Sequence, residues 1–550
     1  MLQDVDTRTA TAQPLLSVRD LEVTFGDSAQ PVLNKVSFDV QPGERVAIVG
    51  QSGSGKSTII GAILRLLPGA GRISGGSILL GPDELASATE KHMRLVRGSR
   101  IALVPQDPAS NLNPAMKVGA QIADALVEHG LSGRDTIRQR VVELMTEAGI
   151  PDAARRSTQF PHEFSGGMRQ RVLIAIALAR EPELLIADEP TSALDVTVQR
   201  QILNHLQTLV ESRGTSLLFI THDLGVAADR TDRIIVMLDG NIVESGTPAE
   251  ILLNPQHEYT KRLVAAAPTA TTVASRPTAA ELGVAHKILN EPILVVENLV
   301  KEFKLRGQRG SILRAVDDVS FSVARGTTTA IVGESGSGKT TVARIVLGLE
   351  TASSGDARID GQTITASRGS ERAALQRRVQ PVFQDPYGSL DPTYSIERLI
   401  DEPLRIFKVG DRASRRERVG ELLDQVALPR SIAQRRPNEL SGGQRQRVAI
   451  ARALALDPEL LICDEAVSAL DVLVQDQILE LLDSLQKRLG ISYLFITHDL
   501  AVVRQIANSV IVMKQGKIVE NGSVDDVFAR PAAEYTRELL GAIPGGAFDR

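Results

Sequence analysis

The chain has 550 residues, of which 43% are hydrophobic and 23% charged, and its formal net charge is −5. These values are typical of a soluble globular protein with more than one domain, and they argue against a strongly basic nucleic-acid binder. A single cysteine, Cys463, excludes a disulfide framework within the chain. The longest apolar run, Val172 to Ala179, is too short to cross a bilayer, so we expect no direct membrane span.

The first half opens with an alternating, strand-like stretch from Leu15 to Phe25. A short apolar run then leads directly into the segment GQSGSGKS, Gly50 to Ser57, and helical periodicity follows it. Strand, glycine loop and helix in this order are the context that a phosphate-binding P-loop requires. Backbone N–H groups of such a loop surround the phosphates of a nucleotide, its lysine reaches the terminal phosphates, and the hydroxyl binds magnesium.

The remainder of the first half supplies further parts of a nucleotide site. Residues 119–149 are helical and polar-faced, which predicts a separate helical subdomain. Two later apolar runs indicate buried parallel strands, the first ending in Asp188 and Glu189 and the second followed by His222. An aspartate in that position can hold the magnesium shell, and the adjacent glutamate can orient or deprotonate the attacking water.

The second half repeats the first. The segment GESGSGKT runs from Gly333 to Thr340, and the 276 residues that separate Ser165 from Ser441 also separate His222 from His498. A constant offset between chemically distinct residues indicates an internal duplication. Between the halves, residues 268–290 are rich in Thr, Ala and Pro, which predicts a linker. We therefore predict a first domain with its tail over 1–267, a linker over 268–290 and a second domain with its tail over 291–550.

A third motif makes a family resemblance specific. FSGGMRQR begins at Phe164 and LSGGQRQR at Leu440, and such sequences after a P-loop resemble the signature of ATP-binding-cassette (ABC) ATPases. The resemblance implies an α/β fold with two tandem P-loop ABC nucleotide-binding domains. Each would have a RecA-like α/β core, an antiparallel β edge and a helical subdomain.

In that family two nucleotide domains pair head to tail, and the signature of one covers the ATP held by the P-loop of the other. The halves of this chain would then pair intramolecularly, with the second signature completing the site of Lys56 and the first completing that of Lys339. The resemblance implies catalytic roles for Glu189, His222, Glu465 and His498. The expected magnesium ligands are Ser57, Gln106, Asp188, Thr340, Gln384 and Asp464.

The expected ATP-binding residues include these ligands and the signatures. In the first half they are Phe25, Gly50, Ser52, Gly53, Ser54, Gly55, Lys56, Ser57, Thr58, Gln106, Ser165, Gly166, Gly167 and Asp188. In the second half they are Phe303, Gly333, Ser335, Gly336, Ser337, Gly338, Lys339, Thr340, Thr341, Gln384, Ser441, Gly442, Gly443, Gln444 and Asp464. The two phenylalanines either stack on adenine or belong to the core. The segments SALD, 192–195 and 468–471, resemble the D-loop of the family.

Flanking residues narrow the resemblance. QDPASNLNP and QDPYGSLDP, which begin at Gln106 and Gln384, look like the ATPases of dipeptide and oligopeptide importers, a group that also serves nickel and glutathione. The resemblance implies ATP and Mg²⁺ as cofactors, two transmembrane permease subunits, an extracytoplasmic solute-binding protein and a peripheral position on the cytoplasmic face of the bacterial membrane. No iron–sulfur cluster is expected, because the C-terminal tails of the two domains, 257–268 and 533–544, contain no cysteine. The solute itself stays open.

Two other classes remain as alternatives. One is a soluble tandem-ABC ATPase that acts on ribosomes or nucleic acid, but translation factors of that type look different between the cassettes, where they carry a long charged helix. The other is an exporter, whose chain usually includes fused transmembrane helices. We expect neither, and no nucleic-acid partner.

Overall fold

The computed structural model describes residues 13–26, 30–128, 130–191, 194–266, 292–304, 312–365, 367, 369–468 and 470–543. The chain divides into two compact units, the first made mainly of residues up to 267 and the second mainly of residues 268–546. The predicted linker, 268–290, lies outside the described residues.

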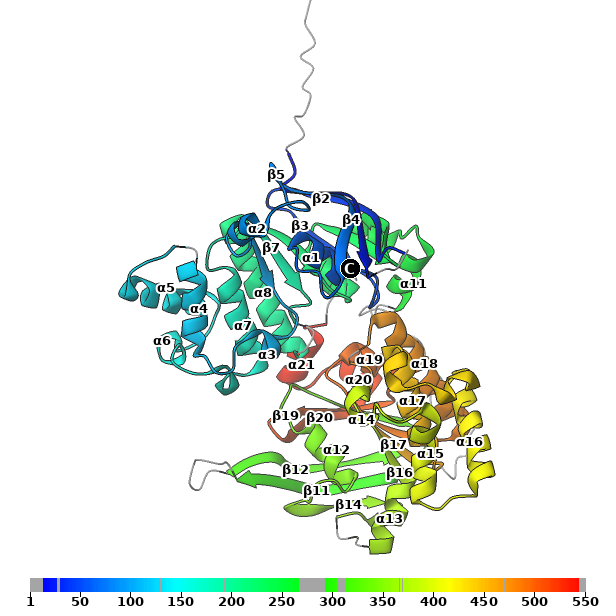
Figure 1. Ribbon diagram of the computed structural model, residues 1–550. Coiled ribbons are helices and arrows are strands. Elements are labelled where there is room, and N and C mark those ends of the chain that lie inside the picture. Colours follow the sequence, from blue (N-terminus) through cyan, green and yellow to red (C-terminus); the bar gives the residue numbers. More distant parts are fainter. Residues whose placement is uncertain are drawn as a thin grey trace, which may run out of the picture. The chain divides into compact units, whose positions relative to one another are not determined.

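The first unit contains two sheets (Figure 1). An antiparallel sheet has the order β2-β1-β4-β5, and a six-stranded sheet has the order β10-β9-β3-β8-β7-β6. In the latter, β3, β6, β7, β8 and β9 pair in parallel, and β10 is antiparallel to β9. The strands are β1 (Leu16–Phe25), β2 (Leu33–Val40), β3 (Arg45–Val49), β4 (Gly71–Leu80), β5 (Asp83–Glu84), β6 (Ile101–Val104), β7 (Leu184–Asp188), β8 (Ser216–Ile220), β9 (Arg233–Leu238) and β10 (Asn241–Gly246).

Helices surround the parallel sheet, so its strands are buried on both faces and read as continuous apolar runs. The helices of the first unit are α1 (Lys56–Ile63), α2 (Glu90–Val96), α3 (Pro108–Asn111), α4 (Val118–Glu128), α5 (Arg134–Glu147), α6 (Ala153–Arg156), α7 (Gly166–Ala177), α8 (Val196–Arg213), α9 (Leu224–Arg230), α10 (Pro248–Leu253) and α11 (Glu258–Ala266). A 3₁₀ turn, Pro161–Glu163, precedes α7.

The second unit repeats this arrangement, with sheets of order β12-β11-β14-β15 and β16-β17-β18-β13-β19-β20. Its strands are β11 (Pro292–Lys304), β12 (Ile312–Ala324), β13 (Thr328–Val332), β14 (Ser354–Ile359), β15 (Gln362–Thr363), β16 (Val379–Val382), β17 (Leu460–Asp464), β18 (Ser492–Ile496), β19 (Ser509–Lys514) and β20 (Lys517–Ser523). Its helices are α12 (Lys339–Val346), α13 (Gly369–Arg378), α14 (Pro386–Ser389), α15 (Ile396–Ile406), α16 (Arg412–Gln425), α17 (Gly442–Leu454), α18 (Val472–Leu489), α19 (Leu500–Ile506), α20 (Val524–Ala529) and α21 (Glu534–Leu540). Two 3₁₀ turns, Arg430–Gln434 and Pro437–Glu439, lie before α17.

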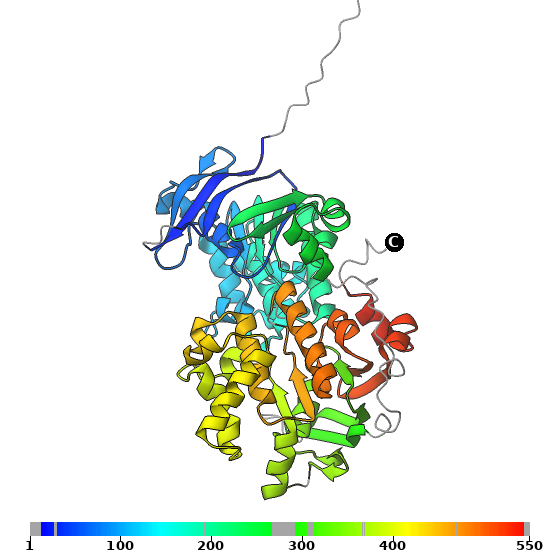
Figure 2. The ribbon, with the colours of Figure 1, turned by 90° about the vertical axis from the view of Figure 1, so that its right-hand side faces the viewer.

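Each unit carries a helical arm, α4 to α6 in the first and α15 with α16 in the second. In the second unit the arm lies on the side away from the antiparallel sheet β11-β12-β14 (Figures 1 and 2). Apolar side chains of the arm form one continuous core with α17 and the parallel sheet there. The predicted fold class, with two tandem cassettes and helical subdomains, is confirmed. Within the described residues no helix combines the length and apolar character of a membrane span.

Candidate active site

The first P-loop joins β3 to α1, as the sequence predicts. Gly53 and Gly55 have φ values of 83° and 102°, in the left-handed region that favours glycine. A Cβ on Gly55 would also lie 2.6 Å from Leu33 Cδ2. The buried Lys56 ammonium donates to the carbonyl oxygens of Gly50 at 2.6 Å and Gln51 at 2.9 Å. The loop therefore closes around its own lysine.

The second P-loop, between β13 and α12, has the same geometry. Lys339 Nζ donates to the carbonyl oxygens of Gly333 at 2.7 Å and Glu334 at 2.8 Å. Gly338 has φ of 105°, and a Cβ there would lie 2.3 Å from the carbonyl oxygen of Ala315. Thr340 Oγ1 donates to Asp464 Oδ1 at 3.3 Å, so the expected magnesium hydroxyl and carboxylate are adjacent.

The acidic pair of the first half meets both other predicted catalytic groups. Asp188 ends β7, and Glu189 follows in the left-handed region with φ of 42°. Glu189 Oε1 lies 3.3 Å from His222 Nδ1, and its Oε2 accepts a hydrogen bond of 2.8 Å from Gln106 Nε2. The backbone N–H of Glu189 donates to Ile220 O at 2.9 Å, which holds the carboxylate at the edge of the sheet.

The second half repeats this cluster nearly atom for atom. Glu465 has φ of 49°, its Oε1 lies 3.4 Å from His498 Nδ1, and its Oε2 accepts from Gln384 Nε2 at 2.7 Å. Asp499, which follows the histidine, caps α19 through its carboxylate and so fixes the turn that presents His498. The structure thus brings together in each half three side chains that the sequence separates by many residues.

The electrostatics of the acidic pair differ between its two members. Burial and the neighbouring charge of Glu189 raise the pKa of Asp188 to about 6. For Glu189, burial alone would raise the pKa, but the hydrogen bond and charge of His222 outweigh it and lower the pKa. Burial would lower the pKa of His222, and the hydrogen bond to Glu189 outweighs this and raises it. Each group therefore favours the charged form of the other.

The same directions hold in the second half. Burial and the charge of Glu465 raise the pKa of Asp464. His498 lowers the pKa of Glu465 against the effect of burial, and Glu465 in turn raises the pKa of His498. In both halves, the glutamate is thus a carboxylate able to accept a proton, and the aspartate is a half-buried carboxylate that a cation would stabilise.

The signatures lie at the start of α7 and α17, helices that pack on the arms. Ser165 Oγ accepts from the N–H of Met168 at 3.3 Å, and Ser441 Oγ accepts from that of Gln444 at 3.3 Å. Gln444 also closes a capping box, because its Oε1 accepts from Ser441 N at 3.0 Å. In the first signature the equivalent residue is Met168, whose side chain has no amide and so cannot accept the corresponding hydrogen bond from Ser165 N.

The adenine and D-loop predictions remain predictions. Phe25 packs against the core of the first unit, where a Cβ on Gly71 would lie 2.7 Å from its ring. Phe303 is 37% exposed, and Lys301 Nζ lies 4.9 Å from its ring centroid. Ser192, Ala193 and Ala469 of the two SALD segments lie outside the described residues.

Two tyrosines of the tails contact the P-loops and were missed from the sequence. Tyr259 OH accepts a hydrogen bond of 2.8 Å from the N–H of Gln51, and Tyr535 OH accepts one of 3.0 Å from that of Glu334. The sequence does contain a pattern that could have indicated these tyrosines, because the segment EYT recurs in both tails. Nothing in the sequence, however, connects this segment to the P-loop, which lies about 200 residues earlier in the chain.

The residues present fit a nucleotide with a divalent cation. Each P-loop is built on glycines that a Cβ would disturb, and each has a buried lysine turned into the loop. In the second half the Thr340 hydroxyl donates to the half-buried carboxylate of Asp464, and in both halves the pKa of this aspartate, Asp188 or Asp464, is raised. Among the described residues no three His, Cys, Asp or Glu side chains gather as a metal cage. A hydroxyl and a carboxylate offer the oxygen ligands that Mg²⁺ prefers.

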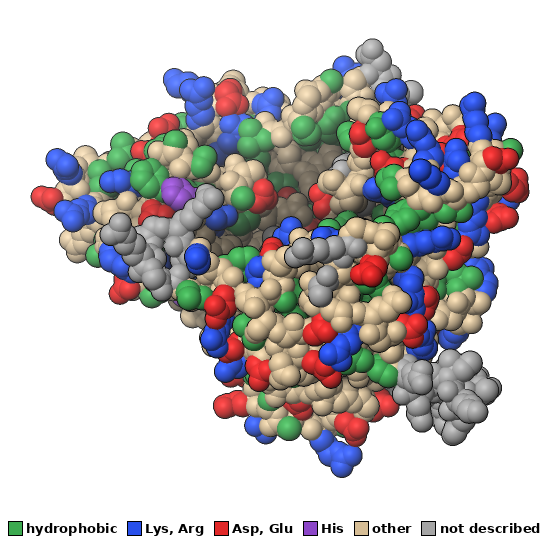
Figure 3. Space-filling view, turned by 90° about the horizontal axis from the view of Figure 1, so that it is seen from below, with side chains coloured by type: hydrophobic (Ala, Val, Ile, Leu, Met, Phe, Trp, Pro, Cys, Tyr) green, Lys and Arg blue, Asp and Glu red, His purple; other side chains and the backbone are tan. Residues whose placement is uncertain are grey.

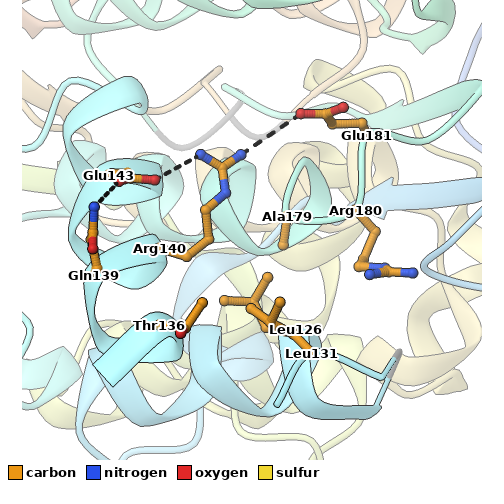
Figure 4. Close-up of a pocket in the computed structure, with 9 residues that line it drawn as sticks. All are labelled: Leu126, Leu131, Thr136, Gln139, Arg140, Glu143, Ala179, Arg180 and Glu181. Carbon is orange, nitrogen blue, oxygen red and sulfur yellow. Dashed lines mark hydrogen bonds and ion pairs between the residues drawn. The ribbon is translucent and has the colours of Figure 1, made fainter. Parts of the chain in front are cut away.

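A cleft elsewhere in the first unit has a different character (Figure 4). It has a volume of about 370 Å³ and lies between α4, α5 and the turn after α7. Arg140 points into it and pairs with Glu143 at 3.3 Å and with Glu181 at 3.8 Å, so its charge is already compensated (Figure 4). The residues that line the cleft include none of the predicted site residues. They are Leu126, Leu131, Thr136, Gln139, Arg140, Glu143, Ala179, Arg180 and Glu181.

Comparison with known proteins agrees with this geometry. The family described as ABC transporter matches residues 33–192 and 316–468, and the family described as oligopeptide/dipeptide transporter, C-terminal region, matches residues 243–289. The peptidoglycan transport ATP-binding protein YejF of Agrobacterium fabrum is 44% identical over 96% of this chain and 96% of its own length.

Further relatives are glutathione import ATP-binding proteins GsiA. The protein of Pectobacterium atrosepticum is 43% identical over 96% of this chain and 89% of its own length. The protein of Salmonella choleraesuis is 42% identical over 97% of this chain and 90% of its own length. The matches span both cassettes, and the predicted resemblance is confirmed. The chain belongs to the ABC transporter family and is an ATPase with two tandem cassettes.

Proposed function

We propose that this chain is the ATP-hydrolysing subunit of an importer for peptides or a related small solute such as glutathione. It would act on the cytoplasmic face of the bacterial membrane with two separate permease subunits and an extracytoplasmic solute-binding protein. The observation that carries the proposal is the match of residues 243–289 to the C-terminal region of oligopeptide/dipeptide transporters. The names of the relatives, aligned over nearly the whole chain, point to the same class of cargo.

In each half the bound nucleotide supplies the phosphoanhydride that is cleaved, and Mg²⁺ neutralises its charge. Ser57, Asp188 and Gln106 would hold the cation in the first half, and Thr340, Asp464 and Gln384 in the second. Glu189 and Glu465 would accept the proton of the attacking water, a role that their lowered pKa values permit. Both clusters are complete, which supports two hydrolysing sites.

The head-to-tail pairing of the halves belongs to the same proposal. Ser165 and Ser441, each at a helix N-terminus, offer an anion a hydroxyl donor and the backbone N–H groups of the first helical turn. ATP bound between the P-loop of one half and the signature of the other would draw the halves together, and hydrolysis would release them. Permeases that bind the loops carrying Gln106 and Gln384 would convert this closure into alternating access.

A ribosome- or nucleic-acid-directed ATPase is the weaker alternative. The relatives that align over nearly the entire chain carry names for transport. On the face drawn in Figure 3, acidic and basic side chains are interspersed, so that face presents no continuous basic stripe for a phosphate backbone.

The test is solute uptake in cells that lack the gene. Uptake of radiolabelled tripeptide and of radiolabelled glutathione is compared between the deletion strain, the strain complemented with the wild-type chain, and one complemented with Glu189→Gln/Glu465→Gln. We expect at least one solute to be taken up only with the wild-type chain. Unchanged uptake of both solutes, with the chain cosedimenting with ribosomes, would contradict the proposal.

A further inference from the structure

Each cassette ends in a tail whose tyrosine contacts the P-loop of the same unit. Tyr259 on α11 is 5% exposed and Tyr535 on α21 is 6% exposed, so both hydroxyls are removed from bulk water. Each accepts a hydrogen bond from the backbone N–H of the second P-loop residue, Gln51 at 2.8 Å and Glu334 at 3.0 Å. Both copies of the duplicated unit therefore keep the same bond between the tail and the P-loop.

The tails are themselves held to the sheet. Glu244 on β10 accepts hydrogen bonds from the N–H groups of Gln256 at 2.8 Å and His257 at 3.0 Å, directly before α11. Glu520 on β20 does the same before α21, with Ala532 at 2.7 Å and Ala533 at 3.0 Å. Each tyrosine therefore stands on a helix whose start is fixed to the edge strand.

Packing connects the second tail to the catalytic elements of its unit. Tyr535 and Leu539 belong to a buried apolar cluster with Val332 of β13, the strand that leads into the P-loop. Val503 of α19, the helix that follows His498, lies in the same cluster. Lys514 Nζ lies 4.3 Å from the centroid of the Tyr535 ring, which further restricts the ring. The tail is thus part of the core that supports the site.

A P-loop rich in glycine has many backbone states when no phosphate is bound. Any contact that holds it in its binding conformation reduces the ordering cost of nucleotide binding. We infer that Tyr259 and Tyr535 are positioning residues for ATP: each anchors the P-loop of its own half, so that the nucleotide affinity of that half depends on its tail. The inference rests on the proposed role of the P-loops as ATP sites.

The experiment measures binding of a fluorescent ATP analogue with Mg²⁺ to the full chain, one half at a time. Lys339→Ala leaves the first half as the competent site, and Lys56→Ala leaves the second. In the Lys339→Ala background we expect Tyr259→Phe to weaken binding about fivefold, the equivalent of one hydrogen bond of about 1 kcal/mol, and Tyr535→Phe to have no effect. In the Lys56→Ala background the two tyrosines exchange roles.

Tyr493→Phe is the matched control for a purely structural effect. Tyr493 is fully buried, and its hydroxyl donates to the carbonyl oxygen of Leu482 at 2.8 Å, away from the P-loop. It should lower the unfolding temperature and leave affinity unchanged in the Lys56→Ala background. Equal affinities for Tyr→Phe and parent chains in both backgrounds, or a loss with Tyr493→Phe as large as with Tyr535→Phe, would overturn the inference alone. Absence of binding in both parent backgrounds would overturn the ATP-site assignment as well.

Discussion

Glu189 contacts His222, with Oε1 of the carboxylate 3.3 Å from Nδ1 of the imidazole. The second unit reproduces the pair between Glu465 and His498 at 3.4 Å. In both, a glutamine amide, that of Gln106 or Gln384, donates a hydrogen bond to the other carboxylate oxygen. The carboxylate that we propose as the proton acceptor is therefore oriented from two sides, and both halves have the same arrangement.

Replacing the glutamate should shift the titration of its histidine. In Glu189→Gln, the hydrogen bond to a carboxylate and its charge are lost while burial remains, so the pKa of His222 should fall below its wild-type value. At pH values near the wild-type pKa, the imidazole of the variant is then more often neutral. An NMR titration of histidine ring protons measures this. The His498 signal is the internal control and should not move; a shift of His498 alone, or no shift at all, contradicts the assignment of the pair.

The same substitutions should separate binding from hydrolysis. Glu189→Gln and Glu465→Gln keep the size and polarity of the side chain but remove the proton acceptor, so we expect each to reduce the hydrolysis rate of its half about 100-fold or more. Binding of an ATP analogue should be retained. The two quantities are measured by phosphate release and by equilibrium titration.

Glu183→Gln provides the matched control for that experiment. Glu183 precedes β7, at the end of the strand opposite Asp188, and pairs with Arg100 at 2.6 Å. This variant should hydrolyse ATP at close to the wild-type rate. Near-normal hydrolysis with the double variant Glu189→Gln/Glu465→Gln would remove both glutamates from the mechanism.

The P-loop backbone makes a separate prediction at Gly338. Alanine there must adopt φ of 105° with its Cβ 2.3 Å from the carbonyl oxygen of Ala315, so the loop has to move. Left-handed backbone strain alone costs about 1–2 kcal/mol. We expect Gly338→Ala to destabilise the second unit by more than this, and to weaken nucleotide binding. Gly361 has φ of 75°, and a Cβ there would meet no atom within 4 Å. Gly361→Ala is therefore a control that introduces backbone strain without a steric clash. Urea unfolding should show the larger loss for Gly338→Ala; equal losses would show that the close contact has no consequence.

Much of the site was predictable because its requirements are local. Glycines before a lysine, and an acidic pair after an apolar run, follow from what phosphate and a sheet edge demand of neighbouring residues. The left-handed backbone of Glu189 was not predictable, because the residue is held by contacts with other strands and loops, among them the bond from its N–H to Ile220 O. The contact between Tyr259 and Gln51 also depends on the fold, since 208 residues separate them.

The chain has a single cysteine, so pairs of introduced cysteines can be used to test how the two halves combine. Cys463 is fully buried in β17, and burial raises the pKa of its thiol to about 12, so it should not react with introduced thiols. Ser52 and Ser335 of the P-loops are exposed, as are Ser165 and Ser441 of the signatures. Cysteines at these four positions can therefore report which signature meets which P-loop.

The most direct measurement is oxidative crosslinking of such pairs in the full chain with ATP bound, in the Glu189→Gln/Glu465→Gln background. A protease site placed within 268–290 then separates halves that are not joined by a disulfide. Head-to-tail sites predict that Ser52→Cys with Ser441→Cys, and Ser335→Cys with Ser165→Cys, leave a full-length product after cleavage. A crosslink of Ser52→Cys to Ser165→Cys within one half, without either of those products, would contradict the account.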